Sequence, residues 1–287
     1  MSRWKELWGA KKLGEITIGS EELLRRYRRR EMYSNLFNSF VVPLVLFFCL
    51  IGLWEVGIRT LNIPQYLLPG PSAILSTFVG DFGLLLSYME GTLSEATRGL
   101  VVGGVIAFWL AVLSYRVEWI ARPMGMYSAF LKAVPLIALT PLLVVWLGIG
   151  AAPRIAVSAL AVAPIVFTFT IQGLKATDPA AGDLMRSYSA GHFQTFRYLD
   201  LPSALPYVFS GLRIGVSTSI IITVIAEFFG GELTTIGTYI RTEAGNLHTV
   251  EVWSAVVMAC TVTLALYGLV SVADRYALAW HPSRRPR

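Results

Sequence analysis

Long runs of apolar residues, each near the length of a membrane-crossing helix, constrain this sequence more than any other feature. An α-helix needs about 20 apolar residues to cross the ~30 Å hydrocarbon core of a bilayer. The chain is 55% hydrophobic and only 15% charged, which argues against a soluble globular domain. We therefore predict an all-α membrane protein with six transmembrane helices, at residues 37–58, 99–115, 124–147, 155–174, 207–229 and 252–272.

Prolines and glycines within these runs predict local features of the helices. Pro135 and Pro141 lie in the third run, and each proline removes a helical hydrogen bond, so this span is expected to kink. Two glycine pairs have the G-x-x-x-G spacing that lets helices approach closely, either within the chain or between two subunits. These pairs are Gly99 with Gly103 and Gly211 with Gly215.

The distribution of basic residues predicts the orientation of the spans. If the N-terminus is cytoplasmic, most of the 24 Lys and Arg residues fall on the inner side, and the outer side holds Arg59, Arg98, Arg154 and Arg241. Cytoplasmic segments of membrane proteins carry such an excess, so both termini are predicted to be cytoplasmic. The net charge of +6 then reflects membrane topology, and nucleic-acid binding is not expected.

The polar segments divide the chain into a basic N-terminal segment at 1–36, a six-span domain at 37–275 and a cytoplasmic tail at 276–287. Acids precede arginines within residues 21–30, as a helix dipole prefers. The N-terminal segment is therefore either an amphipathic helix on the anionic inner leaflet or a solvated tail that only sets topology.

The first apolar run begins too late for a secretory signal, so no cleaved leader is expected. After the first span, a turn rich in Pro and Gly predicts an outer helix capped by Ser72.

Motifs for ATP hydrolysis and for hydrolytic catalysis are missing from the sequence. No lysine follows a glycine, which excludes the phosphate-binding loop G-x-x-x-x-G-K-[ST], and neither H-E-x-x-H nor G-x-S-x-G occurs. Cys49 and Cys260, the only cysteines, lie in apolar runs and form no thiolate metal site. No catalytic residue is assigned, and the chain is not expected to be an enzyme. A membrane enzyme that uses Glu227 and Glu232 is kept as an alternative.

The segment at 175–206 carries the most specific signal. Leu184, Tyr188 and Phe196 recur there with helical spacing, which predicts two helices joined by a turn. Residues 183–202 resemble the cytoplasmic EAA loop of permease subunits in binding-protein-dependent ABC importers, whose pattern is E-A-A, then a glycine, then I-x-L-P. The pattern falls on Asp183, Leu184, Met185, Ser189, Leu199, Leu201 and Pro202.

Other segments place the resemblance in one branch of that family. Residues 68–73, 141–150 and 201–215 resemble permeases for nitrate, sulfonates and taurine. Within this branch, residues 183–187 and 227–231 look more like permeases for riboflavin or for thiamine-pyrimidine precursors.

The resemblance implies a type I ABC importer permease fold, also called MetI-like, and a conduit rather than a catalyst. It implies a separate dimer of ABC ATPase subunits, which bind ATP and Mg, and a second permease that is identical or homologous. It also implies a periplasmic or lipid-anchored binding protein that delivers a small polar solute. The location it implies is the inner (plasma) membrane, in contact with lipid, and no cofactor or metal is expected in this chain.

Residues of the segment at 175–206 are expected to couple the chain to the ATPase. A docking helix needs apolar anchors and a few charges, which Phe193, Phe196 and Tyr198 and the arginines Arg186 and Arg197 supply. The alternative is an amphipathic helix that packs only on its own bundle.

The turn within this segment departs from the family pattern, because Ser189 stands where a glycine is usual. Glycine permits a positive φ or a close backbone contact at such a turn. Gly191 lies two residues later and is expected to supply this freedom, which would move the turn along the chain.

Polar residues within the predicted spans require a reason, because an ionisable group in hydrocarbon costs a few kcal/mol. Ser219, Thr223 and Glu227 follow one another at one-turn intervals, so they form the polar face of a water-filled path or bond within the helices. Lys132 either snorkels to the inner interface or lines an inner vestibule, and Arg213 is expected to snorkel. An ion-coupled secondary transporter that titrates Glu227 or Lys132 is the alternative function.

Overall fold

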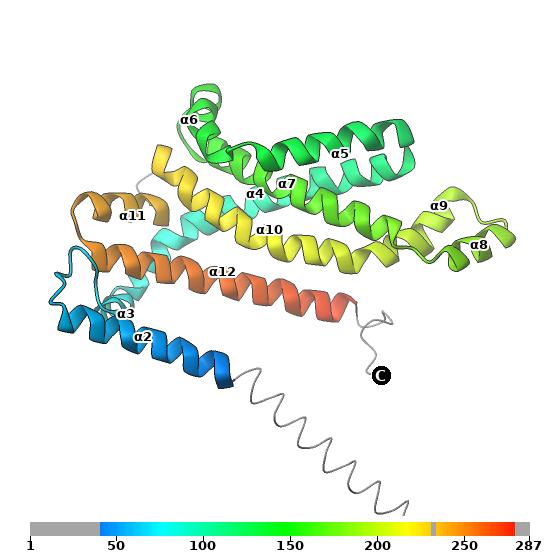
Figure 1. Ribbon diagram of the computed structural model, residues 1–287. Helices are drawn as coiled ribbons and strands as arrows, with labels where there is room; N and C mark the ends of the chain where they lie inside the picture. The colour runs from blue at the N-terminus through cyan, green and yellow to red at the C-terminus, as the bar shows by residue number, and fades with distance from the viewer. Residues whose placement is uncertain (1–40, 231–233, 279–287) are drawn as a thin grey trace, which may run out of the picture. The chain divides into compact units, whose positions relative to one another are not determined.

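The computed structural model describes residues 41–230 and 234–278, which form helices and short connections (Figure 1). Strands are absent from these ranges, as expected of an all-α protein. The chain divides into two units, residues 1–63 and 64–287, and each is considered by itself. Glu232, the predicted N-terminal amphipathic segment and residues 279–287 of the tail lie outside the described residues.

The described part of the first unit is a single span, α2 (Val42–Thr60). A proline lies in its first turn, where backbone N–H groups have no acceptor within the helix, so the proline removes no helical hydrogen bond. The helix ends at Leu61, whose N–H donates to the Gly57 carbonyl oxygen at 3.0 Å, and Asn62 then adopts a φ of 49°. The predicted span at 37–58 is therefore found where the structure describes it.

The second unit contains the other described helices (Figure 1). They are α3 (Pro71–Gly80), α4 (Phe82–Arg116), α5 (Glu118–Ala133), α6 (Leu136–Leu147), α7 (Ala151–Lys175), α8 (Pro179–Ser187), α9 (His192–Thr195), the π-helical turn η2 (Phe196–Asp200), α10 (Leu201–Gly230), α11 (Ile236–Gly245) and α12 (Thr249–Ala277). The helix α7 lies at the centre of this unit, because it packs extensively against both α4 and α10.

Two apolar clusters stabilise this arrangement. One cluster includes Leu85 of α4, Ile220 of α10 and Met258 of α12, and so joins three long helices around the buried start of α11. The other includes Ala107 of α4 and Val166 of α7. Within a bilayer, such clusters stabilise the bundle through close van der Waals packing rather than through removal of apolar surface from water.

The third predicted span is broken rather than gently kinked. The helices α5 and α6 meet at an angle of 97° across a short break, and Pro135 is the N-cap residue of α6. A proline at that position cannot donate the hydrogen bond that would continue α5. Five described helices are long and apolar enough to cross a membrane, and the count reaches the predicted six if the bent pair α5–α6 is one span.

The segment between the first two predicted spans is more helical than expected. The helix α4 begins at Phe82 rather than at residue 99, because Glu95 and its neighbours, which interrupt the apolar pattern, are accommodated inside the fold. The outer helix α3 exists, but its N-cap residue is Gly70 and Pro71 is its first residue. The prediction that Ser72 caps this helix is therefore wrong, since Ser72 already lies within the first turn.

The G-x-x-x-G glycines serve packing within the chain. A Cβ at Gly103 would lie 2.9 Å from the Cα atom of Ala159 in α7, and a Cβ at Gly215 would lie 3.0 Å from the side chain of Leu100 in α4. The contact at Gly103 is with the backbone of Ala159, so α4 can approach α7 this closely only without a side chain at Gly103, whereas the contact at Gly215 is with the end of a flexible side chain.

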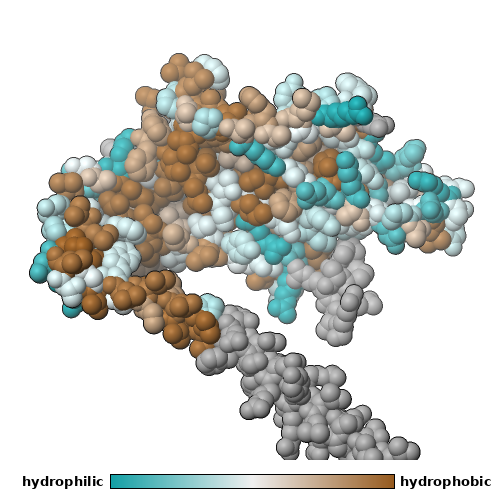
Figure 2. All heavy atoms as spheres, viewed as in Figure 1, coloured by the Kyte–Doolittle hydropathy of each residue, from teal (hydrophilic) through white to brown (hydrophobic). Residues whose placement is uncertain are grey.

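The surface of the second unit separates by polarity along its length. Figure 2 shows hydrophobic residues over the middle of the helices and hydrophilic residues at the end that carries α8 and α9. The polar end is where the sequence predicts the cytoplasmic loop.

Candidate coupling site

The coupling loop, residues 175–206, forms the predicted pair of helices with a turn between them. The first helix, α8, begins at Pro179, and the side chain of Asp178 caps it by accepting a hydrogen bond from the Ala180 N–H at 2.9 Å. The second helix, α9, begins after Gly191, whose N–H donates to the Gln194 side chain at 2.9 Å. Capping at both starts gives this polar segment a defined helical structure outside the apolar spans.

The turn between α8 and α9 lies at Ser189, which has a φ of 54°. The Ser189 N–H donates to the Arg186 carbonyl oxygen at 2.9 Å, and the Ala190 N–H donates to the Met185 carbonyl oxygen at 3.0 Å. This pair of hydrogen bonds is the Schellman ending of a helix, whose left-handed residue is usually glycine. Ser189 thus occupies the usual glycine position with the usual glycine conformation.

The expectation that Gly191 moves the turn is therefore wrong. Gly191 has a φ of −69° and a ψ of 161°, an extended conformation that any residue adopts. The hydrogen bonds at the end of α8 determine the turn position, and a serine is held there despite its β-carbon.

An exposed apolar and aromatic surface covers the two loop helices. Its members are between 57% and 77% exposed, and we call them the docking face: Leu184, Tyr188, Phe193 and Tyr198. Arg186 and Arg197 are exposed beside them. Arg186 also forms an ion pair with Asp183 at 3.4 Å, but both side chains are so exposed that this pair contributes little to stability.

Phe196 differs from the docking face. It is only partly exposed, and the guanidinium carbon of Arg116 in α4 lies 4.7 Å from the centre of its ring. Phe196 therefore faces its own bundle. The alternative interpretation, an amphipathic helix that packs only on its own bundle, applies to this residue.

Leu201 and Pro202, the closing pair of the motif, open α10 directly after η2. The Leu201 N–H donates to the carbonyl oxygen of Phe196, five residues earlier, which is a π-helical bond. Pro202 has no N–H to donate, so the ladder is weakened at the same point. The loop thus continues into the transmembrane helix α10 through an irregular turn.

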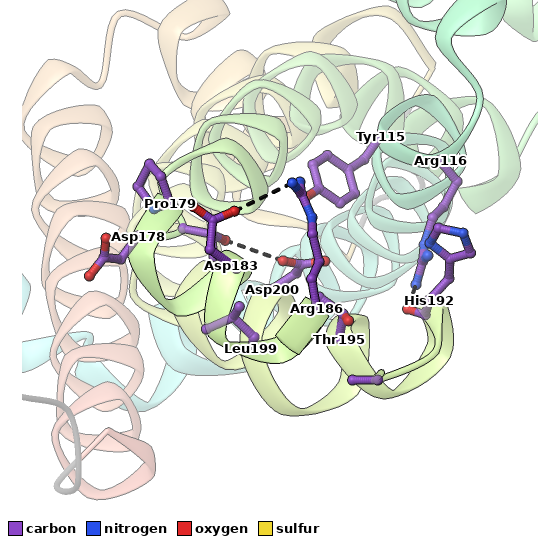
Figure 3. Close-up of a pocket in the computed structure, with 13 residues that line it drawn as sticks. Tyr115, Arg116, Asp178, Pro179, Asp183, Arg186, His192, Thr195, Leu199 and Asp200 are labelled. Carbon is purple, nitrogen blue, oxygen red and sulfur yellow. Dashed lines mark hydrogen bonds and ion pairs between the residues drawn. The ribbon is translucent and has the colours of Figure 1, made fainter. Parts of the chain in front are cut away.

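A pocket of about 500 Å³ lies between α8, α9 and the end of α4 (Figure 3). Charged side chains of both signs line it, and those labelled in the figure include Arg116, Arg186, Asp183 and Asp200. Asp200 is nearly buried, and its carboxylate accepts a hydrogen bond from the Thr177 hydroxyl at 3.4 Å. The pocket separates α8 from the point where α4 meets the loop.

Lys132 lies at the end of α5, beside the break in the third span. Its Nζ atom donates to the Thr168 hydroxyl of α7 at 2.8 Å, and its side chain is exposed on the surface of this chain. The helix begins at Glu118, so about 21 Å of helix separates the two residues at 1.5 Å per residue. Lys132 is therefore about four turns from the start of α5.

Ser219, Thr223 and Glu227 are buried within the chain rather than exposed on a path. Glu227 accepts hydrogen bonds through Oε2 from the Gly237 N–H at 2.6 Å and from the Thr92 hydroxyl at 3.1 Å. The Ile236 N–H donates to the same Thr92 hydroxyl at 3.0 Å. The carboxylate therefore binds the N-terminus of α11, where the helix dipole favours a negative charge. The interpretation of these three residues as path-lining does not agree with this geometry.

A buried ion pair between Glu95 and Arg154 was not predicted. Arg154, in the first turn of α7, is fully buried, and its Nε donates to Glu95 Oε2 at 2.6 Å, with a second contact from Nη2 to Oε1. Arg154 was assigned to an outer loop because the sequence pattern placed both partners outside the spans. The signal in the sequence was a carboxylate and an arginine that flank two apolar runs.

Arg213 also has a partner that the sequence did not reveal. Its Nη1 atom lies 3.8 Å from the carboxylate of Asp274, a buried residue of α12, and its Nη2 donates to the Ser210 hydroxyl at 3.0 Å. A structural role was expected, but an ion pair between helices supplies it rather than snorkelling alone.

The fold and this loop define a class: a multi-span, all-helical membrane protein whose polar helices project from one end of the bundle. The family described as "Binding-protein-dependent transport system inner membrane component" matches residues 99–278. The chain therefore belongs to this family of ABC importer permeases, as the EAA-like loop predicted. These permeases are not themselves enzymes.

Curated relatives agree with the predicted branch. The riboflavin transport system permease protein RibX of Chloroflexus aurantiacus is 26% identical over 84% of this chain and 90% of its own length. The formylaminopyrimidine transport permease protein ThiX of Halalkalibacterium halodurans is 30% identical over 66% of this chain and 75% of its own length. The taurine transport system permease protein TauC of Escherichia coli is 26% identical over 79% of this chain and 85% of its own length.

Solved structures confirm the predicted fold class. The methionine ABC transporter MetNI, in an inward-facing crystal form, includes a chain with a TM-score of 0.57 and 19% identity. That match covers 69% of this chain and 96% of the other. An ABC transporter for the import of the polysaccharide alginate has a TM-score of 0.55, 13% identity and coverage of 86% and 99%. The type I, MetI-like permease fold is thus shared at low sequence identity.

Proposed function

We propose that this chain is the permease subunit of an ATP-driven importer in the inner (plasma) membrane. It passes a small polar solute, delivered by a periplasmic or lipid-anchored binding protein, into the cytoplasm. A dimer of separate ATPase subunits binds ATP and Mg and drives transport, and a second permease, identical or homologous, completes the pathway. Both termini of the chain then lie in the cytoplasm.

The docking face of the coupling loop is the observation that carries this proposal. Exposed aromatic and apolar residues on polar helices outside the spans are costly unless a partner covers them. Aromatic and arginine side chains dominate the binding energy of protein interfaces, and this face combines both. The ATPase is therefore the partner to which Phe193, Tyr198 and Arg197 bind.

Lys132 is the residue that we assign to the translocation path. It is exposed in the last turn of α5, beside the break in the third span and about four turns from the start of that helix. Ionisable residues at such depth face a bundle interior or a water-filled cavity rather than lipid. Glu227 accepts hydrogen bonds from the start of α11 and from Thr92, and this structural role favours the ATP-driven function over the ion-coupled alternative in which Glu227 titrates.

The identity of the solute follows from the binding protein rather than from this chain. The relatives carry names for riboflavin, formylaminopyrimidine and taurine transport, so these three compounds are the first ligands to screen. A ligand that binds the native binding protein raises its melting temperature by mass action.

Uptake by the reconstituted complex tests the proposal. We expect ATP-dependent accumulation of the solute in proteoliposomes that contain this permease, its ATPase and its binding protein. Arg197→Glu and Phe193→Ala should each weaken ATPase association, by about 2 kcal/mol for the aromatic anchor. Uptake driven by an ion gradient without ATP would instead support a secondary transporter.

A further inference from the structure

Arg116, the last residue of α4, contacts the coupling loop from another part of the bundle. Its Nη2 atom donates a hydrogen bond to the His192 carbonyl oxygen at 2.9 Å (Figure 3). Its guanidinium carbon lies 4.7 Å from the centre of the Phe196 ring. A cation within about 6 Å of an aromatic ring is attracted to its face. One side chain of α4 thus binds the first residue of α9 and the first residue of η2.

Tyr115 adds a second contact from the same helix end. Its side chain contacts Asp200, the nearly buried last residue of η2. Tyr115 and Arg116 both line the pocket between α4 and the loop (Figure 3). The end of α4 therefore contacts the π-helical turn at both of its ends, at Phe196 and at Asp200.

The coupling loop is joined covalently to the bundle at both ends, to α7 through residues 176–178 and to α10 through η2. The connection to α10 is irregular, because η2 is π-helical and Pro202 donates no hydrogen bond. In contrast, α4 packs against α7 over a long contact and has a regular helix up to Arg116. The contacts of Arg116 supply a noncovalent connection from α9 and η2 to α4.

We propose that Arg116 is a positioning residue that transmits the movement of the coupling loop to α4, so that α4 and α10 move together when the ATPase subunits close. Phe196 is the partner through which it acts, rather than an anchor on the ATPase. This inference rests on the proposed function, since it concerns how the same loop conveys ATPase movement.

The number of solute molecules transported per ATP hydrolysed, measured in proteoliposomes, tests this role. Arg116→Met keeps the length of the side chain and removes its charge and its hydrogen bond. We expect it to lower this ratio about fivefold or more, while the ATPase stays bound and hydrolysis continues. Arg116→Lys, which retains the cation, should restore part of the ratio. Arg122→Met, at an exposed arginine of α5, is the matched control and should leave the ratio unchanged.

A double variant tests whether Arg116 acts through Phe196. Phe196→Leu should lower the ratio to a similar degree, and the double variant should lower it no further, because both changes break one connection. A normal ratio for Arg116→Met, loss of the ATPase from that variant, or multiplied effects in the double variant would overturn the proposal. If the unaltered complex shows no ATP-dependent uptake, the proposed function itself fails, which is a distinct outcome.

Discussion

The left-handed conformation of Ser189 leads to a prediction about local stability. An L-residue in this conformation pays about 1–2 kcal/mol relative to the right-handed one. Glycine avoids that cost but loses about 0.5–1 kcal/mol through its greater freedom in the unfolded chain. Ser189→Gly should therefore stabilise the end of α8 by about 0.5–1 kcal/mol, which corresponds to a roughly two- to fivefold lower population of the opened turn.

Hydrogen exchange of the purified complex measures this effect directly. The N–H groups of Ser189 and Ala190 close the Schellman ending, so their exchange should slow by roughly two- to fivefold in Ser189→Gly. Ser187→Gly, within α8, is the matched control and should speed exchange, since glycine weakens a helix interior. Unchanged or faster exchange in Ser189→Gly would refute the assignment of strain to Ser189.

Three further predictions concern the interior of the bundle. Arg154→Met should destabilise the protein by about 3–5 kcal/mol, because it leaves the Glu95 carboxylate buried without its arginine. The double variant Glu95→Gln/Arg154→Met should recover part of this loss, and thermal unfolding in detergent measures both variants. Gly103→Ala should lower the free energy of unfolding by about 1–3 kcal/mol in the same assay, because the added methyl group meets α7. Gly125→Ala, where a Cβ has open space, is the control and should not destabilise the protein; equal stability of the two variants would contradict the packing. Thr223→Cys, in a Cys-free background, should resist water-soluble thiol reagents in every nucleotide state, and labelling would restore the path interpretation.

Hydrophobic run length and loop motif were enough to predict the main architecture. The apolar spans, a distortion near Pro135 and the helix pair of the coupling loop follow from local patterns, because run length, proline and capping signals act within one segment. The 97° break at Pro135 is sharper than the predicted kink. The start of α4 was missed because Glu95 interrupts its apolar pattern. Glu95 is accommodated inside the bundle by its ion pair with Arg154, a residue distant in the sequence, so local patterns do not reveal it.

The roles of individual polar residues were harder to predict than their presence. Ser219, Thr223 and Glu227 have the spacing of a polar helix face, but that face turns toward α11 and α4, and spacing alone does not reveal the neighbour. Phe196 belongs to the aromatic set of the loop, yet Arg116 covers it from a distant helix. The position of the turn at Ser189 depends on hydrogen bonds at the end of α8, which outweighed the preference for glycine.

Site-specific photo-crosslinking tests the central claim, that the coupling loop is where this permease binds its ATPase. A photoreactive amino acid at Phe193, on the exposed docking face, should crosslink to the ATPase subunit in native membranes, with a yield that changes between ATP-bound and nucleotide-free states. The same amino acid at Tyr66, an exposed residue before α3, is the control and should yield no ATPase adduct. Equal crosslinking from both positions, or none from Phe193, would contradict the account.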